Sequence, residues 1–305
     1  MGIDITDPNL VTPPFKPESI ILPDGSQEAA CTPTCLPDCS WVFDRVTVRH
    51  VVTGGTRVEW VMHPMFAESL PHSFQLQMGR TGVGIADDWT DVGDPVEDAF
   101  YAIDPDQRLY GQTPWTHYRI ELTTSEHVYY SRPEPALGLL TRGDWLKWKS
   151  LVRQWDFQFK HGPGGQEGLL LKRKLYGERC SCLDPRTLEV TKPQHTECFG
   201  TGFVAGYFDP EPCVFAELGL RMTQEKLDGQ RGTTNDLVVQ AKMLAFPQLM
   251  DKDVWIDKDT DIRYFISGIQ NLAEVRGVPV AVGANLKPAP LSHVIYQFPI
   301  TGING

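Results

Sequence analysis

The chain has 305 residues, 41% of them hydrophobic and 22% charged, with a formal net charge of −11 at pH 7. This composition is typical of an ordered chain with a buried core and argues against a disordered or fibrous protein. The excess of 39 acidic over 28 basic side chains argues against a nucleic-acid binder. The apolar runs are too short to cross a bilayer, so we expect no membrane partner.

The N-terminal residues lack the basic and apolar regions of a secretory signal, so we expect a chain made and used in a cytoplasm. Residues 1–40 are expected to form an extended arm, because prolines interrupt every helical or alternating period. Three cysteines at four-residue intervals lie in it: Cys31, Cys35 and Cys39. A zinc ion would need a fourth ligand, for which Asp38 and His50 are candidates; ordinary thiols or contacts with a neighbouring chain are the alternative.

Residues 41–135 alternate between apolar and polar side chains and carry regular turn signals, which predicts a small antiparallel β-sandwich. A hairpin turn is expected at residues 53–56. The expected strands cover residues 42–51, 57–62, 73–78, 98–103, 117–123 and 128–131. The order of aromatic and polar strands resembles that of fibronectin type III and immunoglobulin-like modules, which implies an Ig/FN3-like sandwich.

Residues 136–215 are expected to contain an amphipathic helix and a cysteine knuckle. Large apolar side chains recur at helical spacing: Trp145, Trp148, Leu151, Val152, Trp155 and Phe159. Thr141 and Asp144 form a plausible capping pair, and the glycines after His161 end the helix. We expect the tryptophans to pack in the core or between subunits rather than to line a ligand site.

Four metal-binding side chains follow the helix in two pairs: Cys180 and Cys182, then His195 and Cys198 after a loop of twelve residues. Soft ligands at this spacing favour a tetrahedral Zn²⁺ ion. Two disulfides, or no bond at all, are the alternative. Because four protein ligands would fill the coordination sphere, we expect a structural zinc and no catalytic one.

Two further runs of residues flank these ligands. The run Leu171-Lys-Arg-Lys-Leu-Tyr-Gly177, the Cys-x-Cys pair and the run Cys198-Phe-Gly-Thr-Gly-Phe-Val-Ala-Gly-Tyr207 resemble a motif of tailed-bacteriophage virion proteins. In that motif the second pair is usually Cys-x-x-Cys, so His195 stands where a cysteine is expected. The resemblance covers residues 140–210 and implies a virion structural protein.

Residues 216–305 are expected to form a small β-barrel, with strands over 237–245, 253–256, 263–269, 278–282 and 293–298. Their pattern resembles the stopper and head-completion proteins of phage necks, with Arg276-Gly277 as the matching turn. In those proteins, rings of copies surround the DNA channel. Asp257, Asp259 and Asp261 lack the glycine and glutamate of a calcium loop, so we expect a solvated turn.

No nucleophile elbow, zinc-protease helix or phosphate-binding loop occurs, so no catalytic residue is assigned and we do not expect an enzyme. The resemblances imply a ring-forming neck protein, a head–tail connector or stopper, in a virion assembled in the host cytoplasm. Its partners would be copies of itself and the neighbouring portal, neck and tail proteins, with DNA passing without sequence-specific binding. The alternatives are a baseplate or tail-associated protein, or a zinc-dependent enzyme or carbohydrate-binding protein.

Overall fold

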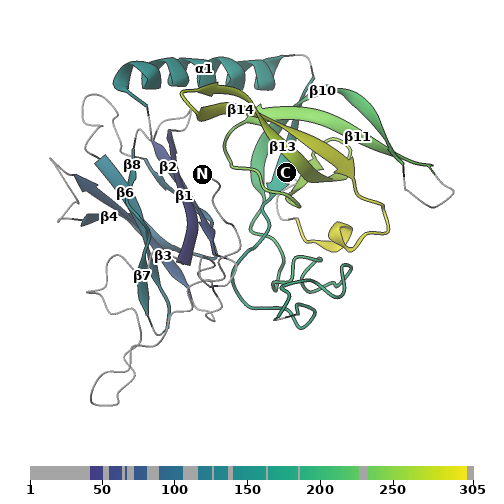
Figure 1. Ribbon diagram of the computed structural model, residues 1–305, viewed down its shortest axis with the longest axis horizontal. Helices are drawn as coiled ribbons and strands as arrows, with labels where there is room; N and C mark the ends of the chain where they lie inside the picture. Colours follow the sequence, from purple (N-terminus) through teal and green to yellow (C-terminus); the bar gives the residue numbers. More distant parts are fainter. Residues whose placement is uncertain are drawn as a thin grey trace, which may run out of the picture.

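The computed structural model describes residues 42–50, 55–63, 66, 72–80, 89–105, 116–125, 127–136, 140–162, 164–184, 186–226 and 233–300. The predicted arm and its three cysteines lie outside these residues. The prediction of a mainly β chain is confirmed: strands make up 50% and helices 12% of the described residues. Two sheets, a helix and a closed barrel follow one another along the chain (Figure 1). In the described part of the chain, no helix combines the length and the apolarity needed to cross a membrane.

Two antiparallel sheets form the first module, named here the two-sheet module. One sheet has the order β1 (Phe43–His50), β2 (Thr56–Met62), β5 (Tyr101–Asp104). The other has the order β4 (Trp89–Glu97), β3 (Ser73–Arg80), β6 (Thr116–Thr123), β7 (Val128–Tyr130), with β8 (Glu134–Pro135) pairing β6. Buried and half-buried side chains alternate along β6, as expected of a strand with one face in the core. Trp60 of β2 and Phe74 of β3 lie in one hydrophobic core, so the two sheets pack against each other.

The helix α1 (Arg142–His161) begins and ends where the sequence predicts. The Thr141 hydroxyl accepts a hydrogen bond from the Asp144 backbone N–H at 3.3 Å, and Gly162 caps the other end. Trp148 is buried against the barrel, where its indole N–H donates to the carbonyl oxygen of Pro279 at 3.1 Å. The expected packing role of the tryptophan face is confirmed for Trp148.

Six strands close into a barrel beneath this helix (Figure 1). In chain order they are β9 (Gly165–Leu171), β10 (Glu211–Lys226), β11 (Thr233–Leu244), β12 (Val254–Asp257), β13 (Arg263–Val275) and β14 (Val278–Pro288). β9 closes the barrel because it pairs with β10 on one side and with β12 on the other. Phe215, Met243 and Trp255 belong to its buried apolar core. The Arg276-Gly277 turn joins β13 to β14, with φ of 51° and 79°.

Two expectations about the C-terminal third are wrong. The predicted barrel boundary at residue 216 falls inside β10, since the barrel starts at β9 and its first two strands are separated by the cysteine segment. Residues 293–298 are not a strand: they contain the 3-10 helix η3 (Val294–Gln297), whose first turn is capped by the His293 side chain. Ile295 and Phe298 pack with Leu171 of β9, so this segment covers the barrel rather than extending it.

β10 and β11 extend beyond the barrel as a two-stranded ribbon. β9 pairs only with Glu211–Ala216 of β10, and β14 pairs only with Val239–Leu244 of β11. Beyond these residues the two strands pair with each other as far as Lys226 and Thr233. Figure 1 shows this ribbon projecting from the body of the molecule.

Candidate metal centre

The four predicted ligands lie in an insertion, residues 172–210, between the neighbouring barrel strands β9 and β10. This segment, named here the knuckle, contains isolated bridges in place of long strands, for example between Arg179 and Phe203. The Cys180 backbone N–H donates to the carbonyl oxygen of Gly202 at 2.9 Å. This pairing brings the loop of the first two cysteines against the loop of His195 and Cys198.

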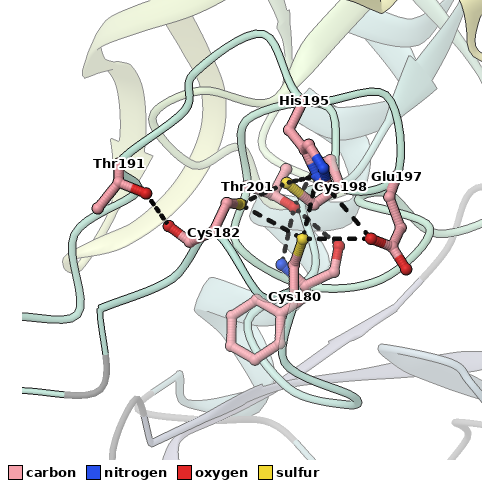
Figure 2. A network of polar contacts seen from close by, with 8 residues as sticks. Cys180, Cys182, Thr191, His195, Glu197, Cys198 and Thr201 are labelled. Carbon is pink, nitrogen blue, oxygen red and sulfur yellow. Dashed lines mark hydrogen bonds and ion pairs between the residues drawn. The ribbon is translucent and has the colours of Figure 1, made fainter.

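The four ligand atoms converge on one point (Figure 2), and all lie within 4.8 Å of one another. The Cys180 sulfur lies 3.2 Å from His195 Nδ1 and 3.4 Å from the Cys182 sulfur. The Cys182 and Cys198 sulfurs are 3.2 Å apart, well beyond the roughly 2.0 Å of a disulfide bond. Ligands about 2.0 to 2.3 Å from a tetrahedral zinc ion lie about 3.3 to 3.8 Å from one another. The cluster therefore has nearly the dimensions of a zinc site.

The turn after Cys198 explains the glycines of the Cys-Phe-Gly-Thr-Gly run. Gly200 and Gly202 have φ of 82° and 89°, a backbone conformation that favours glycine. A Cβ atom on Gly202 would lie 2.7 Å from the Leu183 side chain, and one on Gly200 would lie 2.5 Å from the Pro193 carbonyl oxygen. Both positions of the turn therefore favour glycine.

The same turn creates an anion-binding environment at Cys198. Burial opposes ionisation of this thiol, but hydrogen bonds from the Cys182 thiol and from the backbone N–H groups of Gly202 and Gly200 outweigh it and lower its pKa to about 7. Burial, together with the sulfurs of Cys198 and Cys180, raises the pKa of Cys182 to about 12. The turn therefore favours the thiolate form at Cys198, which is the form that binds a metal ion.

Two threonines that the sequence analysis did not assign support the ligand loops (Figure 2). The Thr191 hydroxyl donates to the Cys182 carbonyl oxygen at 2.8 Å, and the Thr201 hydroxyl donates to the Cys198 carbonyl oxygen at the same distance. These hydrogen bonds hold the backbone of two ligand residues in place. The Cys-Phe-Gly-Thr-Gly run could have indicated Thr201, whereas no sequence motif indicates Thr191.

The first residues of the knuckle, 172–176, pack between the barrel and the two-sheet module. Lys172 forms a buried ion pair with Asp253 of the barrel at 2.8 Å and also donates to the carbonyl oxygen of Gln248. Lys174 pairs with Asp98 of the two-sheet module at 2.5 Å. Tyr176 lies in the core of that module. The basic run before the cysteines therefore serves internal contacts and is not a solvated cationic patch.

Two other candidate groups lie outside the cluster. Cys213 is buried in the barrel core, where burial raises the pKa of its thiol. Asp257 organises the acidic turn: its carboxylate accepts hydrogen bonds from the Asp259 backbone N–H at 3.0 Å and from the Thr260 hydroxyl at 2.7 Å. That carboxylate is buried and committed to the turn, whereas Asp259 and Asp261 are exposed, so the expected solvated turn is found only in part.

The chain matches no model of a known protein family and no curated protein. Cys180, Cys182, His195 and Cys198 lie close enough to hold a metal ion, and the three sulfurs and one imidazole are compatible with zinc.

Proposed function

We propose that the knuckle holds one structural Zn²⁺ ion through Cys180, Cys182, His195 and Cys198. Support comes from the donor set, which suits a soft tetrahedral cation, and from the 3.2 to 3.8 Å separations between hydrogen-bonded ligand atoms. Four protein ligands leave no position for a reacting water molecule. The ion's role is therefore to cross-link two loops that share little apolar core.

The chain itself is proposed to be a structural component of a tailed-phage virion, most specifically a ring-forming neck protein that joins the capsid portal to the tail. The observation that carries this proposal is the place of the knuckle. Lys172 and Lys174 connect it through ion pairs to the barrel and to the two-sheet module. A metal cross-link where the barrel and the two-sheet module meet makes their connection more rigid, which suits a protein that bears mechanical load in an assembly.

A second ionic connection joins the modules directly. Arg57 of β2 forms a bidentate pair with Glu211 at the start of β10, and Arg57 also donates to Glu59 at 2.6 Å. All three side chains are largely buried, so separating the modules would leave charges unpaired in the interior. The two-sheet module, proposed to be an Ig/FN3-like sandwich, would project outward as a rigid extension of the barrel.

The ribbon of β10 and β11 gives the proposed ring a means of reaching a neighbour. Within the described residues, neither strand has a third strand beside it beyond the barrel. Free strand edges are places where another chain can add hydrogen bonds. DNA would pass such a ring without sequence-specific binding, because a net charge of −11 repels phosphate.

Native mass spectrometry combined with metal analysis tests the proposal. We expect cyclic oligomers that carry one zinc ion in each chain and show no hydrolytic activity. A monomer with an open, catalytically active zinc would contradict both the ring and the structural metal. A density map of the assembled particle that placed the chain in the baseplate would contradict the neck assignment while keeping the virion role.

A further inference from the structure

The outer face of α1 carries a cationic and apolar stripe on an otherwise acidic chain. Its members recur at steps of three and four residues and so share one face of the helix: Arg142, Leu146, Lys149, Arg153, Phe157 and Lys160. Leu146 is 49% exposed and Phe157 is 65% exposed, so the stripe offers apolar as well as cationic side chains to a partner. No carboxylate is exposed on this helix: Asp144 is buried, and the half-buried Asp156 pairs with Lys160 at 3.0 Å.

An acidic surface lies elsewhere on the molecule. β4 is an edge strand, and within the described residues its outer side has no strand partner. Asp91, Asp94 and Glu97 are exposed along it, and the strand itself contains no cationic residue. Asp91 accepts a hydrogen bond from Gln77 at 2.9 Å and lies near Arg119, whose guanidinium packs over the Trp89 ring. Asp94 and Glu97 are therefore the carboxylates offered to a partner. From end to end, the α1 stripe covers about 27 Å at 1.5 Å per residue. The acidic residues of β4, from Asp91 to Glu97, cover about 20 Å at 3.3 Å per residue.

We propose that the α1 stripe of one copy docks on the β4 edge of a second copy. The inference rests on the proposed ring and specifies how its neighbouring subunits meet. α1 lies over the barrel, and β4 lies at the far edge of the two-sheet module (Figure 1). A contact between two different surfaces of one chain is heterologous, and its repetition closes a ring when the rotation allows it.

The stripe fits a protein surface better than a nucleic acid. Leu146 and Phe157 would gain from burial against another protein but have no partner on a phosphate backbone. Partial burial and the charge of Arg153 lower the pKa of Lys149, so cations are crowded on this face. A carboxylate from a neighbouring copy relieves that repulsion, and the net charge of −11 opposes DNA.

Charge reversal on the full chain tests the docking. The helix variant Arg142→Glu/Arg153→Glu and the strand variant Asp94→Lys/Glu97→Lys should each weaken self-association roughly tenfold or more, because like charges then face each other. An equimolar mixture should recover assembly, since the acidic β4 of the helix variant fits the cationic α1 of the strand variant, and the two reversed surfaces fit each other. Analytical ultracentrifugation at low salt measures both effects.

Matched controls carry the same charge changes at exposed positions away from both surfaces. They are Arg186→Glu/Lys192→Glu on the knuckle and Asp251→Lys/Asp259→Lys on the barrel turns, and both should assemble like the wild type. If the wild type forms rings and the reversed variants also do, the docking is wrong but the ring stands. A wild type that stays monomeric overturns the ring as well. Loss of duplex-DNA binding with unchanged assembly in the helix variant would assign the stripe to phosphate instead.

Discussion

The barrel and the knuckle are neighbours in the chain but obtain their stability in different ways. The barrel closes its hydrogen-bonded strands around large apolar side chains such as Phe215 and Trp255. The knuckle's own buried cluster consists of Cys180, Cys182 and Cys198 with Val190 beside them. Burial of apolar surface stabilises the first region, whereas the second depends on what its sulfurs bind. Changes to the metal should therefore affect the knuckle first, and changes to the apolar core should affect the barrel first.

Removal of the metal should have the largest effect. Structural zinc sites contribute about 10 to 16 kcal/mol of apparent binding free energy, so a strong chelator should unfold the knuckle, residues 172–210. Backbone amides there should lose protection in hydrogen-exchange mass spectrometry, while those of β11 and β14 keep theirs. Readdition of zinc should restore protection. A knuckle that stays protected after metal loss would show that its hydrogen bonds suffice.

Loss of a single metal ligand should destabilise the knuckle and leave the barrel intact, nearly as clearly as removal of the metal. Cys198→Ser removes a thiolate that is fully buried in the cluster, so zinc content and the melting temperature of the knuckle should both fall. Cys213→Ser is the matched control, because this cysteine lies in the barrel core and has no part in the cluster. It should keep its full zinc content. Equal zinc content in the two variants would rule out the proposed ligand set.

The sequence predicted the features that depend on local spacing. Alternation located β6, the helical period located α1, and the spacing of soft ligands brought Cys180 and His195 to one site, where their ligand atoms lie 3.2 Å apart. In each case the residues that determine the feature lie close together in the chain. Local propensity and turn chemistry then agree with the final fold.

The missed features depend on partners that are distant in the chain. β9 closes the barrel by pairing with β12, more than eighty residues later, and nothing in Gly165–Leu171 announces that partner. β4 was missed because Gly93 and Pro95 interrupt its alternation. Residues 293–298 resemble a strand in composition, but the His293 side chain caps a short 3-10 turn, which tertiary packing then holds over the barrel.

Truncation of Trp148, the α1 tryptophan that packs against the barrel, tests whether apolar burial stabilises the barrel independently of the metal. Trp148→Ala should reduce the free energy of unfolding by about 3 to 5 kcal/mol, because it leaves a cavity and removes the partner of the Pro279 carbonyl. Zinc content should not change. Gln154→Ala, on the exposed face of the same helix, should alter stability by less than about 0.5 kcal/mol. Chemical denaturation provides the measurement, and a loss of zinc from the Trp148 variant would show that the two regions are not independent.

Two glycine variants of the knuckle should show the smallest effect. Their comparison distinguishes crowding by a neighbouring side chain from backbone strain. Gly202→Ala and Gly177→Ala both place a Cβ atom at a positive φ, of 89° and 112°, which costs about 1 to 3 kcal/mol at either site. Only Gly202 is crowded, with Leu183 at 2.7 Å, whereas nothing lies within 4 Å of a Cβ atom on Gly177. The Gly202 variant should therefore lose additional stability and zinc affinity, because the turn that directs N–H groups at Cys198 must open. Zinc competition titrations compare the two variants, and equal affinities would mean that the close packing around Gly202 does not hold the ligand in place.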